Sequence, residues 1–104
     1  MWSRVPAFPP IPTENNLIYN YPNLFSSYTI IDYQLSEKTK VNLTIYDIRG
    51  KLITTLVNQE QIQGHYEVGW YGNDNSGNLA RSGLYICNMI AGDFRKSIKM
   101  LLLK

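Results

Sequence analysis

Apolar and polar residues alternate along most of this chain with a period of two. The first clear run spans residues 28–35 and the second spans residues 41–46, with a polar connection at residues 36–39 between them. Successive side chains of a β-strand point to opposite faces, so this alternation predicts strands that are buried on one face. The polar connection has the residue types that favour a turn.

Glycine-containing turns divide the remainder of the chain into further short runs. Asp47–Gly50 predicts a tight hairpin turn in which Gly50 adopts a positive φ, and Gly92–Asp93 predicts a second one. The predicted strands after the first turn are residues 51–57, 66–70, 84–90 and 94–104. About six or seven short strands without a helical segment predict an all-β, immunoglobulin-like or fibronectin III-like antiparallel β-sandwich of about seven strands.

The amino-terminal part has a different composition. All five prolines lie within residues 3–23, which favours extended chain over helix. The sequence therefore predicts a Pro/Asn-rich linker over residues 1–23 and the β-sandwich over residues 24–104. Such a spacer suits a domain at the end of a larger protein. A disordered terminus or an expression artefact is the alternative.

Composition narrows the classes of function. The 104 residues suit one domain, and the formal charge of +2 comes from dispersed residues without the basic run that tracks a phosphate backbone. Nucleic acid is therefore not expected as a partner. The start of the sequence lacks the pattern of a signal peptide, and no apolar run reaches the length of about 18 residues that spans a bilayer. We do not expect an integral membrane protein.

The residue types that perform catalysis or bind metals are scarce. His65 is the only histidine, and its parity places it opposite Tyr66 and Trp70, as expected for a solvated strand residue. Cys87 is the only cysteine, which excludes an internal disulfide, and its parity predicts a small buried side chain. We therefore predict no catalytic residue, no metal ligand and no cofactor, and so no enzyme.

Two short motifs have ordinary explanations. Residues 73–77 resemble a calcium loop, but the alternate acidic positions and the following glutamate are missing, so turn-forming side chains explain them better. Asn42–Thr44 satisfies the glycosylation pattern, yet it lies in the middle of a predicted strand. Neither motif points to a site.

Tyrosine is enriched, with eight copies. Aromatic rings on the surface of a β-sandwich can bind carbohydrate, which would make this chain an accessory domain of an upstream hydrolase. However, parity predicts that Tyr33, Tyr66 and Tyr85 lie in the core, where a buried ring with one polar tip is usual.

A series of short motifs follows a recognisable order from residue 12 to residue 104. The motifs are Ile11–Glu14, Asn20–Asn23, Val41–Lys51, Trp70–Asp74, Ser82–Tyr85 and Ala91–Lys104. In this order they resemble the type A C-terminal sorting domains of the type IX secretion system. These domains are also similar in sequence to the immunoglobulin-like domain of flagellar hook-capping proteins.

The resemblance implies a targeting role. It implies a folded tail of a larger exported protein that the outer-membrane secretion machinery recognises after export to the periplasm. The expected partners are that machinery and an upstream cargo domain of the same polypeptide, and the expected location is secreted or at the cell surface. A recognition element at the free terminus would be masked by further chain, so the last strand is expected to end the protein.

The last predicted strand is the natural recognition element, because its backbone edge can pair with another protein. The candidate recognition residues are Lys96, Lys99, Met100, Leu101, Leu102, Leu103 and Lys104. Alternatively, Ile98, Met100 and Leu102 are the core face of the strand and the lysines protect an exposed edge. Both interpretations can hold at once.

Three positions depart from the family pattern, since Leu24, Ser27 and Ser36 stand where these sorting domains commonly carry proline. Without proline at these positions, the segment that leads into the sandwich is expected to be less rigid, and this bears on whether the chain functions as a sorting signal. The competing hypothesis is a structural or adhesion immunoglobulin-like assembly module of the hook-capping type. We expect deletion of residues 100–104 to separate the two hypotheses, because only the sorting signal would need these residues.

Overall fold

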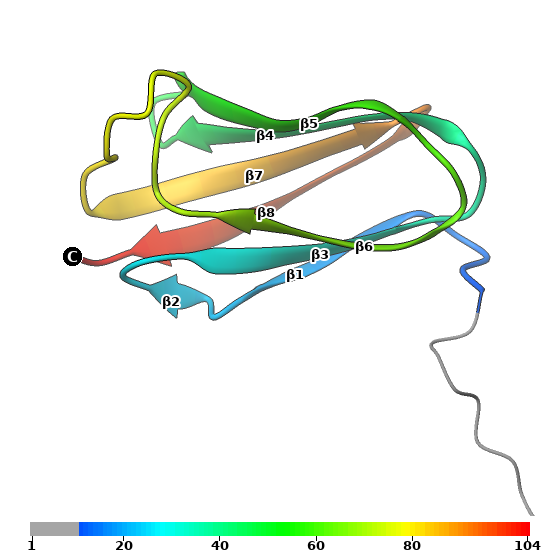
Figure 1. Ribbon diagram of the computed structural model, residues 1–104, viewed down its shortest axis with the longest axis horizontal. Coiled ribbons are helices and arrows are strands. Elements are labelled where there is room, and N and C mark those ends of the chain that lie inside the picture. The colour runs from blue at the N-terminus through cyan, green and yellow to red at the C-terminus, as the bar shows by residue number, and fades with distance from the viewer. Residues whose placement is uncertain (1–10) are drawn as a thin grey trace, which may run out of the picture.

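The computed structural model describes residues 11–104, apart from the side chains of Ile18 and Leu24, and this part of the chain contains eight strands and no helix (Figure 1). The strands are β1 (Asn16–Tyr21), β2 (Leu24–Phe25), β3 (Thr29–Leu35), β4 (Thr39–Asp47), β5 (Leu52–Gln61), β6 (Gly64–Trp70), β7 (Gly83–Ala91) and β8 (Phe94–Leu102). Thus no helix of the described residues is long and apolar enough to cross a membrane.

The strands form two sheets that face each other. The order is β1-β3-β6 in the three-stranded sheet and β2-β8-β7-β4-β5 in the five-stranded sheet. Neighbouring strands are antiparallel except for the short parallel pair of β2 and β8. The predicted all-β sandwich is confirmed, with β2 as a very short addition to the expected strands.

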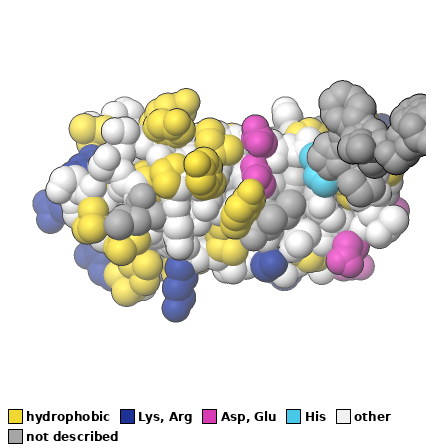
Figure 2. All heavy atoms as spheres, turned by 90° about the horizontal axis from the view of Figure 1, so that it is seen from below, with side chains coloured by type: hydrophobic (Ala, Val, Ile, Leu, Met, Phe, Trp, Pro, Cys, Tyr) yellow, Lys and Arg dark blue, Asp and Glu magenta, His cyan; other side chains and the backbone are white. Residues whose placement is uncertain are grey.

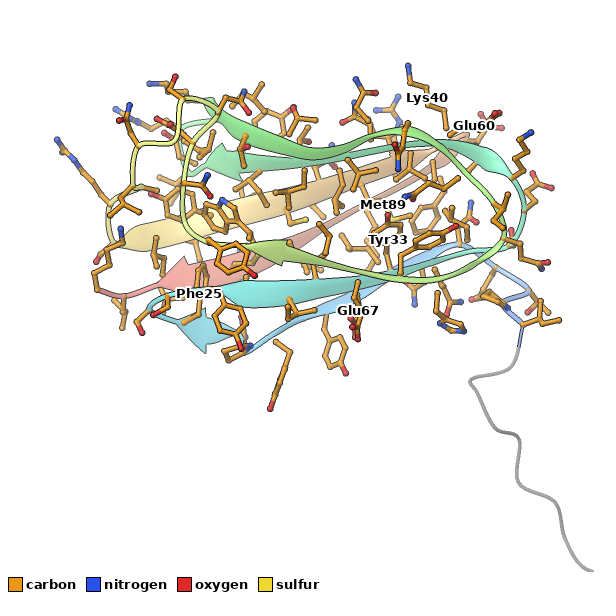
Figure 3. All side chains as sticks on the ribbon, viewed as in Figure 1. Phe25, Tyr33, Lys40, Glu60, Glu67 and Met89 are labelled. Atoms are coloured by element: carbon orange, nitrogen blue, oxygen red, sulfur yellow. The ribbon has the colours of Figure 1, made fainter. Side chains whose placement is uncertain are left out.

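The core lies between the two sheets, and the period-two pattern explains its membership. In β3 the buried residues alternate with half-buried ones, and β7 shows the same alternation. Tyr33 of β3 and Met89 of β7 point into the space between the sheets, whereas Lys40 and Glu60 lie on the outside (Figure 3). Burying a large aliphatic or aromatic side chain in this way contributes about 1.5–3 kcal/mol.

The predicted core tyrosines fall where parity placed them. Tyr33 and Tyr85 are buried, and Tyr66 is half-buried with its ring stacked on that of Tyr33. Each hydroxyl has a partner: Tyr33 donates to Gln61 Oε1 at 2.6 Å, and the other two donate to backbone carbonyls. These rings are therefore structural.

The sandwich begins earlier than the composition suggested. Strand β1 lies within the range predicted to be linker, and its Leu17 is fully buried. The prolines nearest to it, Pro12 and Pro22, flank the strand without interrupting it, so its ladder with β3 stays intact. Residues 1–10 lie outside the described residues, so for them the linker stays a prediction.

Strand β5 is longer than predicted. Residues 58–61 read as part of a polar connection, yet they pair with β4 up to the Thr39–Gln61 pair. Asn58, Gln59 and Glu60 are exposed because β5 is the last strand of its sheet. An edge strand can tolerate polar residues on more than one face, which removes the alternation that would have revealed it.

The outer face of the three-stranded sheet carries exposed side chains from β1 and β6. Figure 2 looks at the molecule from this side and shows hydrophobic side chains spread along the face, with acidic side chains and a histidine among them. Tyrosine counts as hydrophobic in this colouring. The residues that form this face are described below.

Candidate recognition strand

The predicted recognition residues lie on and just after β8, the last strand of the sequence. Strand β8 pairs with β7 along its whole length, from Ala91–Phe94 to Gly83–Leu102. The turn between the strands is formed at Gly92, whose φ of +62° is one that side-chain-bearing residues rarely adopt. The prediction that the last two strands are antiparallel neighbours is confirmed.

The pleat of β8 separates its carboxyl-terminal residues into two rows. Met100 and Leu102 have no exposed surface and belong to the core. Lys99, Leu101 and Leu103 point to the outside, and we call these three residues the outer row. Two of the predicted recognition residues are therefore unavailable to a partner of the folded domain.

The outer row continues an apolar surface of β7. Leu101 lies opposite Leu84, and Lys99 lies opposite Ile86, both of which are half-buried. The exposed fractions of Leu101 and Leu103 are 38% and 49%. A partner that contacts the outer row therefore meets aliphatic side chains with a lysine beside them.

The backbone edge of β8 is partly occupied. Leu101 N–H donates to the carbonyl oxygen of Asn23 at 3.3 Å, and Leu103 N–H donates to that of Phe25 at 2.9 Å. Because edge-facing groups alternate along a strand, the N–H groups of Arg95, Ser97 and Lys99 point to the same side, beyond the end of β2. The last residues of this edge are thus occupied, and β1 lies beside the earlier part of β8.

The remaining lysines have internal contacts at opposite ends of the strand. Lys96 Nζ donates to Asn16 Oδ1 on β1 at 3.0 Å, which links the two sheets. The backbone N–H of Lys104 donates to Ser82 Oγ at 2.9 Å. Both ends of the predicted element are therefore held against the domain.

Aromatic rings support the end of β8 from inside. Trp70 makes edge-to-face contacts with Phe25 and Tyr85, at centroid distances of 5.6 and 5.2 Å. Its Nε1 donates to the carbonyl oxygen of Asn73 at 2.9 Å, which holds the loop after β6. Leu102 lies nearby, against Gly72. This packing fixes which side of β8 faces outward.

The lone cysteine has no reactive character. Cys87 is fully buried in β7, and burial raises the pKa of its thiol to about 12. A thiol needs to ionise in order to act as a nucleophile, so this side chain stays unreactive in the folded domain.

His65 lies on β6, on the outer face of the three-stranded sheet, and is exposed. Among residues 11–104 no group of three His, Cys, Asp or Glu side chains is placed to hold a metal ion. The strand position predicted for His65 is the one that it occupies.

The loop that resembles a calcium site uses its side chains internally. Asp74 Oδ1 accepts from the N–H groups of Ser76 and Asn78, both at 2.9 Å. Asn75 Oδ1 accepts from Thr54 Oγ1 and Thr55 N–H, so the loop covers part of the edge of β5. These bonds explain the composition of the loop as turn chemistry.

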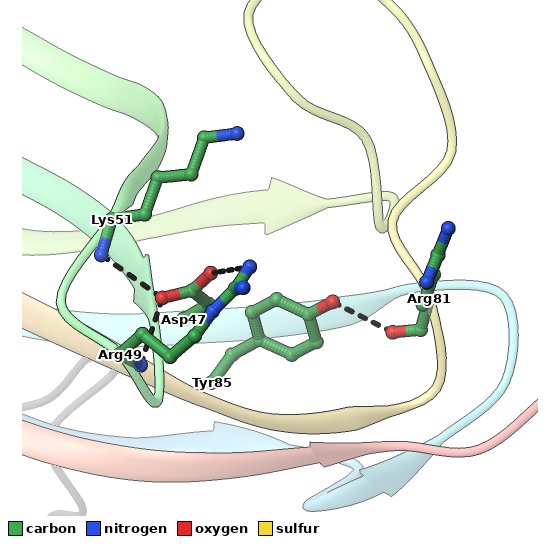
Figure 4. Close-up of polar contacts among 5 residues, drawn as sticks. All are labelled: Asp47, Arg49, Lys51, Arg81 and Tyr85. Carbon is green, nitrogen blue, oxygen red and sulfur yellow. Dashed lines mark hydrogen bonds and ion pairs between the residues drawn. The ribbon is translucent and has the colours of Figure 1, made fainter.

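A groove of about 350 Å³ lies at the end of the sandwich beside the β4–β5 turn. Figure 4 shows hydrogen bonds among some of its polar groups: Asp47 accepts from Arg49 and from the backbone of Lys51, and Tyr85 donates to the carbonyl of Arg81. The Lys51 N–H bond is the first cause that lowers the pKa of Asp47. These bonds hold the turn between β4 and β5 and the segment that leads into β7.

One departure from the family pattern has a structural role. The N–H and hydroxyl of Ser36 both bond to Asn15 Oδ1, at 2.8 and 3.1 Å. Proline at this position would lack the N–H. Ser27 is exposed in the β2–β3 connection.

The two facing sheets, their order and their core define an immunoglobulin-like β-sandwich. The FlgD Ig-like domain family matches residues 26–93, and this chain belongs to it. Its fold is also similar to part of the structure of PorZ, described as an essential bacterial surface component of the type-IX secretion system of Porphyromonas gingivalis. The TM-score is 0.58 at 20% identity, over 83% of this chain and 11% of that one, so this chain corresponds to a small part of PorZ. No curated protein matches the chain.

Proposed function

We propose that this domain is a non-catalytic sorting module that directs a larger exported protein across the outer membrane through the type IX secretion machinery. The observation that carries the proposal is the outer row of β8, where Lys99, Leu101 and Leu103 are exposed while the rest of the strand end is packed. The fold shared with part of PorZ, a surface component of that system, supports the same context.

The chemistry of the outer row suits recognition by another protein. Leucines that are half-exposed offer apolar area, and a lysine beside them adds orientation and charge. In this proposal Lys96, Met100 and Leu102 act indirectly, because they hold the strand in place.

The direct test uses a reporter with an ordinary signal peptide, fused upstream of residues 1–104, in a host that has the machinery. We expect the reporter at the cell surface or in the medium. Retention in the periplasm would contradict the sorting function. Lys99→Glu and Leu103→Ser should each lower surface delivery, whereas Leu79→Ser, which changes a 73% exposed leucine in a loop, should leave it unchanged.

Deletion of residues 100–104 is not a usable test. It removes Met100 and Leu102 from the core, so the domain would lose stability whatever its function. Substitutions in the outer row avoid this difficulty, because they leave the core side chains intact.

The second candidate is an assembly module that pairs with partner subunits, and membership of the FlgD Ig-like domain family favours it. In this case the outer-row variants should be exported normally and should lose a stable complex with a partner subunit. Co-purification from the native host, with the same variants, distinguishes the two candidates.

A further inference from the structure

The outer face of the three-stranded sheet carries four exposed tyrosines, which we call the tyrosine platform: Tyr19, Tyr21, Tyr28 and Tyr71. Their exposed fractions lie between 46% and 68%. A tyrosine ring in water offers a flat apolar surface with a polar tip, the combination that is enriched at binding surfaces. Figure 2 shows hydrophobic side chains on this face.

Strand register places the four rings on one face. Tyr21 of β1 lies opposite Ile30 of β3, which lies opposite Gly69 of β6. One step further along the sheet, Tyr28 and Tyr71 stack at a centroid distance of 5.6 Å with an angle of 26° between their planes. On the other side of the Tyr21 row, Tyr19 of β1 lies in the row of Asp32 and Glu67. Neighbouring rows of one face lie about 6.8 Å apart, so the platform spans three rows.

Gly69 keeps the middle of the platform low. A Cβ atom added at Gly69 would lie 3.1 Å from Cε1 of Tyr71, which is closer than an ordinary contact. The ring of Tyr71 therefore lies over the backbone of β6 at this point. A side chain at position 69 would have to displace it.

A pair of carboxyl groups lies beside the rings, in the row of Tyr19. Asp32 and Glu67 are directly opposite each other on β3 and β6, and Glu67 points away from the sandwich (Figure 3). Asp32 Oδ1 is buried and has no hydrogen-bond partner among the described residues. Burial is the first cause that raises the pKa of Asp32, followed by the charge of Glu67 and a side-chain hydrogen bond with Glu67, whereas the charge of His65 lowers it. Because Asp32 Oδ1 has almost no exposed surface, the acceptor that this pair offers to a ligand is the exposed carboxylate of Glu67.

The platform is held in a fixed position at β1. Asn20, which is buried between the two exposed tyrosines of β1, donates to the carbonyl oxygens of Pro22 and Asn23 and to Thr29 Oγ1. The Thr29 hydroxyl in turn donates to Pro22 O at 2.8 Å. A surface that is rigid before binding loses little entropy when a ligand arrives.

We propose that the tyrosine platform binds a neutral polysaccharide, whose sugar rings stack on the tyrosines and whose hydroxyls donate to the exposed carboxylate of Glu67. The hydrogens of sugar C–H groups are slightly positive and favour the negative face of an aromatic ring. Sugar hydroxyls can donate to the carboxylate of Glu67 without bringing a charge.

The charges of the face argue for a neutral ligand. The outward-facing described residues of β1, β3 and β6 include Asp32, Glu67 and His65 but no lysine or arginine. Anionic glycans and nucleic acids would meet carboxylates without compensating cations. A basic protein is the alternative ligand, because it would satisfy the carboxylates, and its signature in the test below is a protein complex with strong salt dependence.

The test is titration calorimetry of the full chain with cellohexaose, chitohexaose, xylohexaose and mannohexaose. We expect at least one to bind. Tyr21→Ala and Tyr71→Ala should each weaken that binding about 3- to 10-fold, as expected for the loss of one aromatic contact. Tyr21→Phe should retain it, because the ring remains. Gly69→Ala should weaken it while keeping every tyrosine.

The matched control is Tyr46→Ala, which removes a half-buried tyrosine from the five-stranded sheet and should leave saccharide binding unchanged. The proposal is overturned if none of the four saccharides binds or if Tyr46→Ala weakens binding as much as Tyr21→Ala. It is also overturned if the platform variants lose only a protein complex with strong salt dependence. Secretion plays no part in this assay, so its result is independent of the sorting function.

Discussion

The two exposed surfaces of this domain differ in chemistry although they belong to the same sandwich. The tyrosine platform is aromatic and carries carboxyl groups, whereas the outer row of β8 is aliphatic and carries a lysine. They lie on different sheets. A fold of this kind fixes only its inward residues, so each outer face is free to serve a separate purpose.

The difference also shows how each surface is built. The platform consists of exposed side chains over Gly69, and the buried Asn20 supports it from β1. The outer row is held in place by the alternate residues of its own strand, since Met100 and Leu102 pack β8 against the core. Changes to the buried supports should affect stability, and changes to the exposed residues should affect binding alone.

The largest expected effect concerns the buried residues Met100 and Leu102 of β8. Leu102→Ala should lower the free energy of unfolding by about 2–5 kcal/mol, because it empties space in a fully buried site. Leu103→Ala, one residue later and half-exposed, should change it by less than about 0.5 kcal/mol. Denaturant unfolding monitored by tryptophan fluorescence measures both changes in the free energy of unfolding. If both substitutions lowered the free energy of unfolding equally, buried and exposed positions at the end of β8 would not differ as described.

A smaller loss is expected at the support of the platform. Asn20→Ala removes three hydrogen bonds and should destabilise the domain by about 1–3 kcal/mol. Because Asn23 O also accepts from Leu101 N–H, this change should loosen the β2 cover of β8 as well. Hydrogen exchange at Leu101 and Leu103 reports that effect, with Asn78→Ala in an exposed loop as the control. If Asn20→Ala left hydrogen exchange at Leu101 and Leu103 unchanged, the support of the tyrosine platform would not be coupled to the end of β8.

Asp32→Asn should have a modest effect of the opposite sign. The pKa of Asp32 is raised above 3.8 in the folded domain, first by burial and then by Glu67, so its ionisation opposes folding as pH rises through the folded value. We expect the substitution to stabilise the domain by about 0.2–1 kcal/mol at pH 7. The gain should vanish below about pH 3.8, where Asp32 is protonated in both states. If Asp32→Asn still stabilised the domain at pH 3, the gain in stability could not come from the ionisation of Asp32.

The smallest expected effect is at Cys87. With a pKa of about 12 and no exposed surface, its thiol should not react with a maleimide at pH 8 in the folded domain. Reaction should appear only in denaturant. Labelling under native conditions would indicate that β7 opens more readily than its packing suggests.

Sequence patterns predicted the fold well where one face of a strand is buried. The alternation in β3, β4 and β7 gave both the strand and the direction of its side chains. It failed for β1, where a bulge between Leu17 and Tyr19 shifts the register and breaks the alternation. The end of β5 was missed because polar residues at a sheet edge look like a loop.

The candidate sites show the same division. Met100 and Leu102 were predicted as recognition residues, with burial in the core as the alternative, and they are buried. Which part of the β8 edge is occupied depends on β2, whose two residues carry no pattern. Tyr28 and Tyr71 have the parity of exposed residues, so half of the platform was within reach of sequence reasoning. The contribution of Tyr19 and Tyr21 required the register of β1 with β3.

The central claim is that the outer row directs secretion and that the tyrosine platform does not. The most direct measurement is the fraction of a fused reporter that reaches the cell surface, compared between Lys99→Glu/Leu103→Ser and Tyr21→Ala/Tyr71→Ala chains that are equally stable. We predict that the first double substitution leaves the reporter in the periplasm and that the second delivers it like the unmodified domain. Normal delivery with the altered outer row would contradict the account.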